Sequence, residues 1–222
     1  MKHFPIYSVH DVFTNPYEII EMADKLNYSK SPTGNFPGIR SSKLHSLYPE
    51  FWRKFMRSIF GLIWNLDIEK ADSYEAHMYF HKMVPFSKNK KDIRNHGWIH
   101  RDNPAMIAGI VYLTPDADLD SGTSIYTPNS NVILNTDSVK AKEDLYNKDT
   151  YNAKEYKKEY EYSCSQFTQT TKVNNVFNSM VMYGGDTWHK IDNFITGKKE
   201  RLTLNWFLYN IKATSFPMER FR

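Results

Sequence analysis

Hydrophobic positions near the start of the chain recur at three- and four-residue steps, the spacing of one helix face. Residues 47–66 keep this spacing longest and predict the longest helix, through Phe51, Phe55, Ile59, Leu62 and Ile63. A second stripe runs through residues 17–26, directly after Asn15-Pro16, and proline suits the first turn of a helix. Residues 29–42 are rich in serine, proline and glycine and predict a loop between the two helices.

Beyond about residue 72 the pattern changes to a two-residue alternation with many aromatic residues, which is typical of strands. Six such runs are bounded by proline, glycine or polar residues: residues 74–86, 105–115, 121–128, 131–134, 176–185 and 200–211. Short strands that follow a group of helices favour a mainly β (α+β) fold, a β-sandwich or jelly roll. We expect the N-terminal helices to brace its major sheet.

A polar segment interrupts the series of strands. Residues 136–172 are rich in tyrosine, lysine and glutamate and hold too few other apolar residues for a core of their own. We expect either a helical insertion or a mobile flap here. The 222 residues then form a single domain, with a helical part over residues 1–70 and a jelly-roll core over residues 72–212.

Composition narrows the class of protein. The net charge is +4, and the lysines are scattered rather than gathered in a stripe, which argues against nucleic-acid binding. Cys164 is the only cysteine, so the chain can form neither an internal disulfide nor a cysteine-based zinc site, and a reducing compartment is expected. The N-terminus lacks the apolar stretch of a signal peptide, and no window has the length of a membrane span. We therefore expect a soluble, cytoplasmic protein.

The residues with the clearest chemistry are His100 and Asp102. In an extended segment, side chains two residues apart point to the same side, so an imidazole and a carboxylate can converge on one metal ion. Two histidines and one carboxylate form the facial triad of non-haem iron(II) oxygenases. His189, after the predicted strand 176–185, is the candidate for the third ligand. A His-x-Asp motif alone is weak, because such short motifs arise by chance.

A candidate anion site follows on the last predicted strand. Arg201 and Thr203 share one face of residues 200–211, and Trp206 falls on the opposite face. A guanidinium group beside a hydroxyl is a good anchor for a carboxylate. The sequence thus places a candidate carboxylate anchor on a strand that follows the candidate third ligand.

Two segments resemble the 2-oxoglutarate/Fe(II)-dependent oxygenase superfamily. Residues 98–126 are similar to its iron-binding core, and residues 178–209 are similar to its strand pair with the distal histidine and the arginine. Pro37-Gly38-Ile39-Arg40 matches a further element near the start of some relatives. The resemblance is nearest to the prolyl-hydroxylase-like branch and to uncharacterised bacterial and phage members. It covers roughly residues 74–134 and 173–210.

The resemblance implies a double-stranded β-helix (jelly roll, cupin-like) and a ligand set. His100, Asp102 and His189 would bind Fe(II), and Arg201 would pair with the far carboxylate of 2-oxoglutarate. Tyr112 would hydrogen-bond the same carboxylate from inside the barrel mouth, and Thr203 would assist. The activity implied is that of a dioxygenase that uses O2 and 2-oxoglutarate, with ascorbate as a further cofactor, to hydroxylate a substrate and release succinate and CO2.

Other readings remain open at this point. The chain could be a cupin-like metalloenzyme that does not use 2-oxoglutarate, or a binding module without catalysis. The primary substrate is undetermined, with a peptide side chain favoured over a small metabolite, and the polar segment 136–172 is where specificity would reside. His77, His81 and His96 favour structural roles. Arg40, in the predicted loop, could meet an anionic substrate, although a structural ion pair is the commoner fate of such an arginine.

Overall fold

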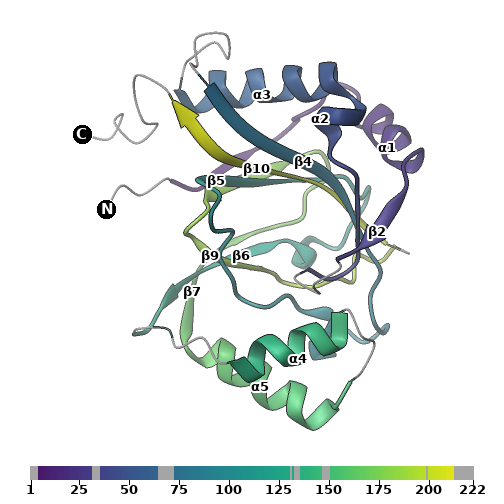
Figure 1. The fold of residues 1–222 in the computed structure, drawn as a ribbon. Coiled ribbons are helices and arrows are strands. Elements are labelled where there is room, and N and C mark those ends of the chain that lie inside the picture. Colours follow the sequence, from purple (N-terminus) through teal and green to yellow (C-terminus); the bar gives the residue numbers. More distant parts are fainter. Residues whose placement is uncertain are drawn as a thin grey trace.

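The computed structural model describes residues 5–31, 36–64, 73–130, 132, 136–146, 151–198 and 200–212. Within these ranges, two antiparallel sheets of seven and three strands form the body of the molecule. One group of helices lies beside the larger sheet, and another lies at the far end, beyond the smaller sheet (Figure 1). None of the helices in the described ranges is long and apolar enough to cross a membrane.

The larger sheet has the strand order β1-β8-β5-β10-β4-β3-β2. Its longest strands, β4 (Ser73–Met83) and β10 (Arg201–Lys212), pair along their whole length with one irregularity between Leu208 and Asn210. The other strands are β1 (Tyr7–Val9), β2 (Tyr28–Lys30), β3 (Ile39–Ser41), β5 (Ile107–Tyr112) and β8 (Met180–Gly184). The smaller sheet has the order β7-β6-β9, from β6 (Thr123–Pro128), β7 (Phe167–Val173) and β9 (Trp188–Ile191).

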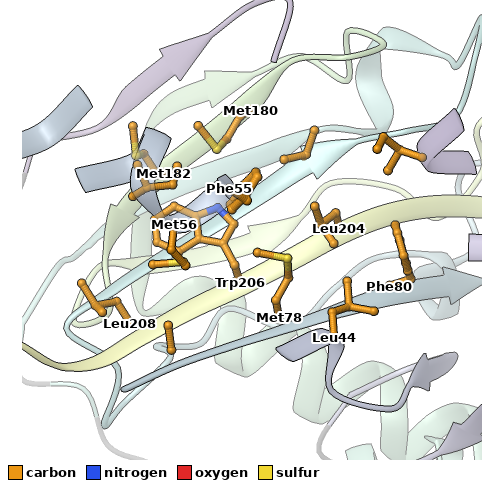
Figure 2. Close-up of a cluster of buried hydrophobic side chains, with 14 of the residues drawn as sticks. Leu44, Phe55, Met56, Met78, Phe80, Met180, Met182, Leu204, Trp206 and Leu208 are labelled. Carbon is orange, nitrogen blue, oxygen red and sulfur yellow. The ribbon is translucent and has the colours of Figure 1, made fainter. Parts of the chain in front are cut away.

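The main hydrophobic core lies between the larger sheet and three helices, α1 (Pro16–Asp24), α2 (Leu44–Leu47) and α3 (Pro49–Trp64). The alternation of β10 explains it, because Leu204, Trp206 and Leu208 all point to the helices. Trp206 is fully buried, and Figure 2 shows Phe55 and Met56 of α3 beside its indole ring. The predicted long helix and its packing against the sheet are therefore confirmed.

The second face of the larger sheet packs against the smaller sheet. Ala108, Ile110 and Tyr112 of β5 form one buried cluster with Ile125 of β6 and with Val181 and Tyr183 of β8. This contact between two sheets confirms the predicted jelly roll. It also means that the side chains of β10 opposite Trp206, starting with Arg201, point between the sheets.

Gly109 of β5 lies directly under the indole of Trp206. A Cβ atom at this position would stand 2.4 Å from Nε1 of the indole, in a core that has no room to yield. We expect Gly109→Ala to lower the free energy of unfolding by about 1–3 kcal/mol. Chemical denaturation measures the change, and Gly61→Ala is the matched control. Gly61 of α3 faces open space, so alanine there should raise stability by up to about 1 kcal/mol. Equal stability of the two variants would contradict this packing.

The polar segment folds into two helices, α4 (Thr136–Tyr146) and α5 (Ala153–Ser165). Their tyrosines supply the core that the segment otherwise lacks: Leu145, Tyr146, Tyr156 and Tyr160 cluster around Trp98. The Trp98 indole Nε1–H donates a hydrogen bond of 2.9 Å to the hydroxyl of Tyr156. Of the two expectations for this segment, the helical one describes the residues that the structure covers.

The end of the polar segment differs from its prediction. Residues 167–172 belong to strand β7, which pairs with β6 instead of extending the insertion. Hydrophobic alternation could not find this strand, because most of its side chains are polar and exposed. The prediction was also wrong at residues 29–42, whose ends form β2 and β3 at the edge of the larger sheet. The strand predicted at residues 131–134 lies outside the described residues except for Val132.

Candidate functional site

His100, Asp102 and His189 converge at one point between the sheets, and we call them the triad. One ligand atom from each lies within 4.8 Å of the others. The Nε2 atom of His189 lies 3.3 Å from one carboxylate oxygen of Asp102, and Nε2 of His100 lies 3.7 Å from the other. Asp102 therefore presents one oxygen to each imidazole.

Backbone carbonyls fix the orientation of both imidazole rings. Nδ1 of His100 lies 2.8 Å from the carbonyl of Trp98, and Nδ1 of His189 lies 2.9 Å from the carbonyl of Thr187. A carbonyl can only accept, so each Nδ1 carries a proton and each ring turns its Nε2 atom inward. Both Nε2 atoms and the carboxylate of Asp102 thus lie together, an arrangement in which a metal ion could bind all three residues.

The pKa values of His100 and Asp102 are both shifted in the direction that favours metal binding. Partial burial, with 43% of the side chain exposed, together with neighbouring His189 lowers the pKa of His100, which favours its neutral imidazole at pH 7. Burial alone would raise the pKa of Asp102, but His189 and His100 lower it to about 2. Metal ions bind neutral imidazole and ionised carboxylate, so no proton on His100 or Asp102 has to be displaced near neutral pH.

Backbone hydrogen bonds hold the triad residues near one another, because the segment before Asp102 runs alongside β9. His100 and His189 exchange two backbone hydrogen bonds of 2.9 Å, and the amide of Asp102 donates to the carbonyl of Gly185 at 2.9 Å. Gly185 is needed for this close approach, since a Cβ there would stand 1.8 Å from the carbonyl oxygen of Ala105. The two histidines are thus held as a cross-strand pair.

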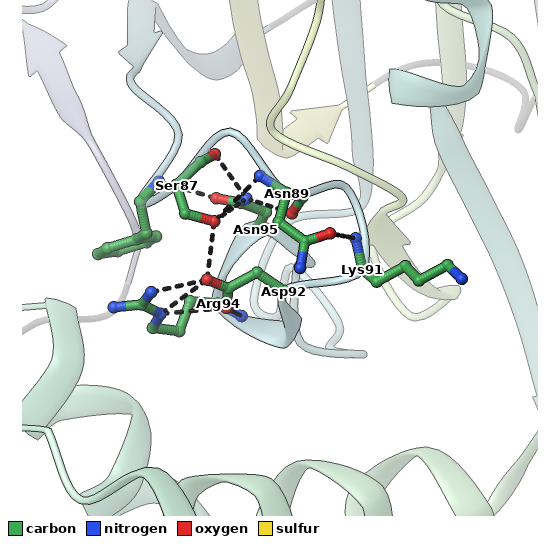
Figure 3. Close-up of polar contacts among 7 residues, drawn as sticks. Ser87, Asn89, Lys91, Asp92, Arg94 and Asn95 are labelled. Carbon is green, nitrogen blue, oxygen red and sulfur yellow. Dashed lines mark hydrogen bonds and ion pairs between the residues drawn. The ribbon is translucent and has the colours of Figure 1, made fainter.

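The loop before the triad is anchored by the fully buried Asn95 (Figure 3). Its amide oxygen accepts from the backbone of Phe86 at 2.7 Å, and its Nδ2 donates to the carbonyls of Ser87 and Asn89 at 3.0 and 3.1 Å. Beside it, hydrogen bonds from Arg94 hold the pKa of Asp92 well below its usual value. This loop leads directly into the segment that carries His100.

Removal of the Asn95 amide is expected to loosen both the fold and the triad. Asn95→Ala leaves several buried backbone groups unpaired, and we expect the free energy of unfolding to fall by about 3 kcal/mol. Affinity for Ni(II) should fall with it, because the loop fixes the approach to His100. Denaturation and metal titration measure the two effects. Asn89→Ala in the same loop is the control, since Asn89 is exposed and its replacement should change little. An unchanged Asn95→Ala protein would show that the loop does not support the site.

Arg201 begins β10 and is fully buried between the sheets. Its Nε donates to the carbonyl of Ser121 at 3.2 Å, whereas its Nη2 is buried and has no hydrogen-bond partner in the described ranges. Burial lowers the pKa of the guanidinium, and no ion pair forms between Arg201 and a carboxylate among the described residues. Asp192 interacts with it only over a longer distance. A buried cation with an unused donor is suited to an anionic ligand.

Tyr112 and Thr203 are neighbours on adjacent strands, beside Arg201. The guanidinium carbon of Arg201 lies 5.6 Å from the centre of the Tyr112 ring. However, the hydroxyl of Tyr112 donates to Oγ1 of Thr123 at 2.8 Å, and Oγ1 of Thr203 donates to Oδ1 of Asn205 at 2.8 Å. Both hydroxyl protons are therefore engaged within the protein, so either group could meet a ligand only as an acceptor or after a rearrangement.

A central cavity opens beside the triad, and all three triad residues line it. Arg201, Tyr112 and Thr203 do not line this cavity. Tyr183 connects the two parts, because it lines the cavity, its ring centre lies 4.4 Å from that of His189, and it interacts electrostatically with Asp102 and Arg201. The sequence analysis did not single out Tyr183. Its alternation with Val181 on β8, facing the inner cluster, was the signal that could have found it.

Two cations also line the central cavity, Arg40 of β3 and Lys142 of α4. Arg40 was weighed at the sequence level, and the structural ion pair expected for it is absent from the described residues. Its guanidinium stacks instead on the ring of Phe36, 3.7 Å from the centroid. Lys142 was not singled out, because only the packing of α4 and α5 on Trp98 brings it to the cavity, and nothing in its local sequence marks it.

The remaining histidines have the structural contacts expected of them. His81 is buried, and its Nε2 lies 2.6 Å from the carbonyl of Pro37, although its ring also lines the central cavity. His77 contacts Lys43 and Glu75. His96 bonds to the backbone carbonyls of Asp192 and Lys90 and takes no part in the triad.

Comparisons with known proteins agree with this fold. HygX from Streptomyces hygroscopicus, solved with nickel, 2-oxoglutarate and hygromycin B, aligns with a TM-score of 0.57 at 12% identity, over 96% of this chain and 84% of HygX. EvdO2 from Micromonospora carbonacea var. aurantiaca aligns with a TM-score of 0.56 at 13% identity, over 96% of this chain and 91% of EvdO2. A prolyl hydroxylase from Trichoplax adhaerens, solved with a peptide, aligns with a TM-score of 0.50 at 8% identity, over 92% and 83% of the two chains.

Sequence comparison gives a single family assignment. No curated protein matches the chain. The model of the family of unknown function DUF6445 matches residues 1–208, almost the whole chain. The chain therefore belongs to the family of unknown function DUF6445, and its fold is the double-stranded β-helix of the 2-oxoglutarate/Fe(II) oxygenases.

Proposed function

We propose that this protein is an Fe(II)- and 2-oxoglutarate-dependent dioxygenase that hydroxylates an organic substrate. One observation carries the proposal: the triad turns three metal-ligating atoms toward one point, on the same side of the larger sheet as a buried arginine with a donor that has no partner among the described residues. The first half of this arrangement calls for a cation, and the second half calls for an anion. A divalent metal ion and a dicarboxylate together satisfy both.

The donor set fits Fe(II). His100 and His189 would each bind through Nε2, and Asp102 would bind through a carboxylate oxygen, which leaves further coordination positions for 2-oxoglutarate and O2. The metal would supply the oxidative chemistry, in which 2-oxoglutarate is converted to succinate and CO2 while a substrate C–H bond is hydroxylated. The carbonyls of Trp98 and Thr187 would hold the two imidazoles in the binding tautomer.

Arg201 separates this proposal from a cupin-like metalloenzyme that does not use 2-oxoglutarate. Such an enzyme has no need of a cation buried between the sheets, and burying an unpaired guanidinium is costly. In our proposal Arg201 pairs with the far carboxylate of 2-oxoglutarate through Nη2. Tyr183 would shield the cosubstrate from water, since it is buried and contacts the ring of His189. Tyr112 and Thr203 would complete the surroundings of Arg201.

Turnover of 2-oxoglutarate in the absence of a primary substrate tests the proposal. Oxygenases of this kind release succinate slowly when uncoupled, so purified protein with Fe(II) and O2 should convert 2-oxoglutarate to succinate, measured by NMR. His189→Ala and a metal-free sample should release none. Protein that binds Fe(II) but never consumes 2-oxoglutarate would favour the cupin-like alternative. Protein that takes up no Fe(II), Mn(II) or Ni(II) would favour a binding module without catalysis.

A further inference from the structure

We propose that Arg40 and Lys142, assisted by Arg101, form an anion-binding site at the mouth of the metal centre, so that the primary substrate carries a carboxylate or phosphate group. The inference rests on the proposed function, because it names the class of substrate that the same centre would oxidise. It deepens that function without using the cosubstrate anchor Arg201.

The location of these cations is the first support. Three hollows meet beside the triad: the central cavity, an outer pocket that runs toward Tyr209, and a side pocket that runs toward Trp188. His100 and Lys142 line all three of them. Arg40 lines the central cavity and the outer pocket, and Arg101 lines the outer and side pockets. A substrate that reaches the metal through any of these hollows would pass at least two cations.

The second support is the absence of counter-charges. Asp102 is the only acidic residue among the described residues that line the three hollows, and the metal would take up its charge. Neither Arg40 nor Lys142 forms an ion pair within the described part of the chain. Nε of Arg40 is buried and has no hydrogen-bond partner among the residues that the structure covers. Cations without counter-charges are typical of a site that binds an anionic ligand, and not of a structural salt bridge.

The charge balance of the loaded centre points the same way. Fe(II), Asp102, Arg201 and doubly charged 2-oxoglutarate cancel one another in formal charge. Arg40 and Lys142 would then remain as uncompensated cations beside a neutral centre. Burial lowers the pKa of both, and Asp102 is the group that chiefly offsets this effect. Once the metal neutralises Asp102, the negative charge of a substrate could take over its role of stabilising Arg40 and Lys142.

Packing holds the two main cations in place from different parts of the chain. The guanidinium of Arg40 stacks on Phe36, and the rings of Tyr79 and Phe207 each lie 5.8 Å from it. A guanidinium that rings hold by its face binds a planar anion through its edge. Lys142 is carried by α4, whose Leu145 and Tyr146 pack in the cluster around Trp98, two residues before His100. The insertion thereby brings a charge to the site that the jelly-roll core alone does not provide.

Matched small probes test the proposal. Benzoate, phenyl phosphate and the neutral benzamide would each be titrated by calorimetry into protein loaded with Ni(II) and 2-oxoglutarate. We expect saturable binding of at least one anion and none of benzamide, with benzoate and phenyl phosphate distinguishing a carboxylate from a phosphate site. Arg40→Gln and Lys142→Gln should each weaken the anion by about tenfold, the loss of one charge-assisted contact. Arg40→Lys, which keeps the charge, should lose less.

The control is Lys154→Gln, which removes an exposed charge from α5 in the same insertion and should leave anion binding unchanged. Equal binding of benzoate and benzamide, binding of no anion, or unchanged affinity in both glutamine variants would overturn the proposal. So would a loss of 2-oxoglutarate affinity in Arg40→Gln, because Arg40 would then be a cosubstrate residue. The same titrations on metal-free protein distinguish a failure of the proposed anion site from a failure of the proposed function. If the triad binds no metal, the proposed function fails, while charge-dependent binding at Arg40 and Lys142 would still stand.

Discussion

Replacing Asp102 by alanine is expected to lower the affinity for divalent metal ions by more than about a hundredfold, a larger loss than removal of a group behind the ligands causes. Asp102 is the only anion of the triad, and it presents one oxygen to each imidazole, 3.7 Å from Nε2 of His100 and 3.3 Å from Nε2 of His189. Without it, two neutral nitrogen donors face a buried cation with no charge to offset its desolvation. Calorimetric titration with Ni(II) or anaerobic Fe(II) measures the change.

The control for this experiment is Asp186→Ala. Asp186 is exposed and stands three positions before His189 in the sequence. Its replacement removes a carboxylate from the same region of the chain but leaves the triad intact. We expect its metal affinity to equal that of the unmodified protein. If Asp102→Ala retained its metal while Asp186→Ala lost it, the metal would bind at the surface and the triad would be an ordinary cluster of polar groups.

The second large effect is expected at Arg201. Arg201→Met keeps most of the side-chain volume and removes the charge, and we expect the dissociation constant of 2-oxoglutarate to rise by about 10- to 100-fold. The free energy of unfolding should change little or increase, because the variant no longer buries a guanidinium whose Nη2 has no partner. Metal affinity should stay the same, since Arg201 belongs to another strand and does not reach the triad.

Calorimetry on the Ni(II)-loaded protein measures the affinity for 2-oxoglutarate, and Thr203→Val serves as a smaller change on the same face of β10. We expect it to weaken 2-oxoglutarate far less, because its hydroxyl already donates to Asn205. An Arg201→Met protein that binds 2-oxoglutarate normally would mean that the cosubstrate is anchored elsewhere. Arg40, which lines the central cavity, would then be the first residue to examine.

Hydrophobic periodicity predicted the parts of the fold that bury apolar faces. The helix α3 and the long strands β4 and β10 follow from residues that alternate or recur toward one core, with Trp206 at its centre. Strands without such a face escaped prediction. β7 is polar along most of its length. β2 and β3 are three-residue strands that extend the larger sheet beyond β4, with β3 paired to β4 and β2 paired to β3.

Some residues of the candidate site could likewise be predicted from the sequence, and others could not. His100, Asp102 and His189 could be named because a resemblance supplies the partner for a motif that alone carries little information. Arg40 and Lys142 could not be assigned, because their place beside the triad depends on the short strand β3 and on the tyrosine-rich packing of the insertion. Charged residues of this kind have no periodicity, so only a three-dimensional arrangement reveals that they share one cavity.

In the proposed function, the triad and Arg201 together hold a ferrous ion chelated by 2-oxoglutarate. Anaerobic titration of Fe(II)-loaded protein with 2-oxoglutarate, followed by visible absorption, tests it most directly. We expect a weak charge-transfer band that saturates at one equivalent of 2-oxoglutarate per bound iron. A protein that binds iron at the triad but develops no such band at saturating 2-oxoglutarate would contradict it.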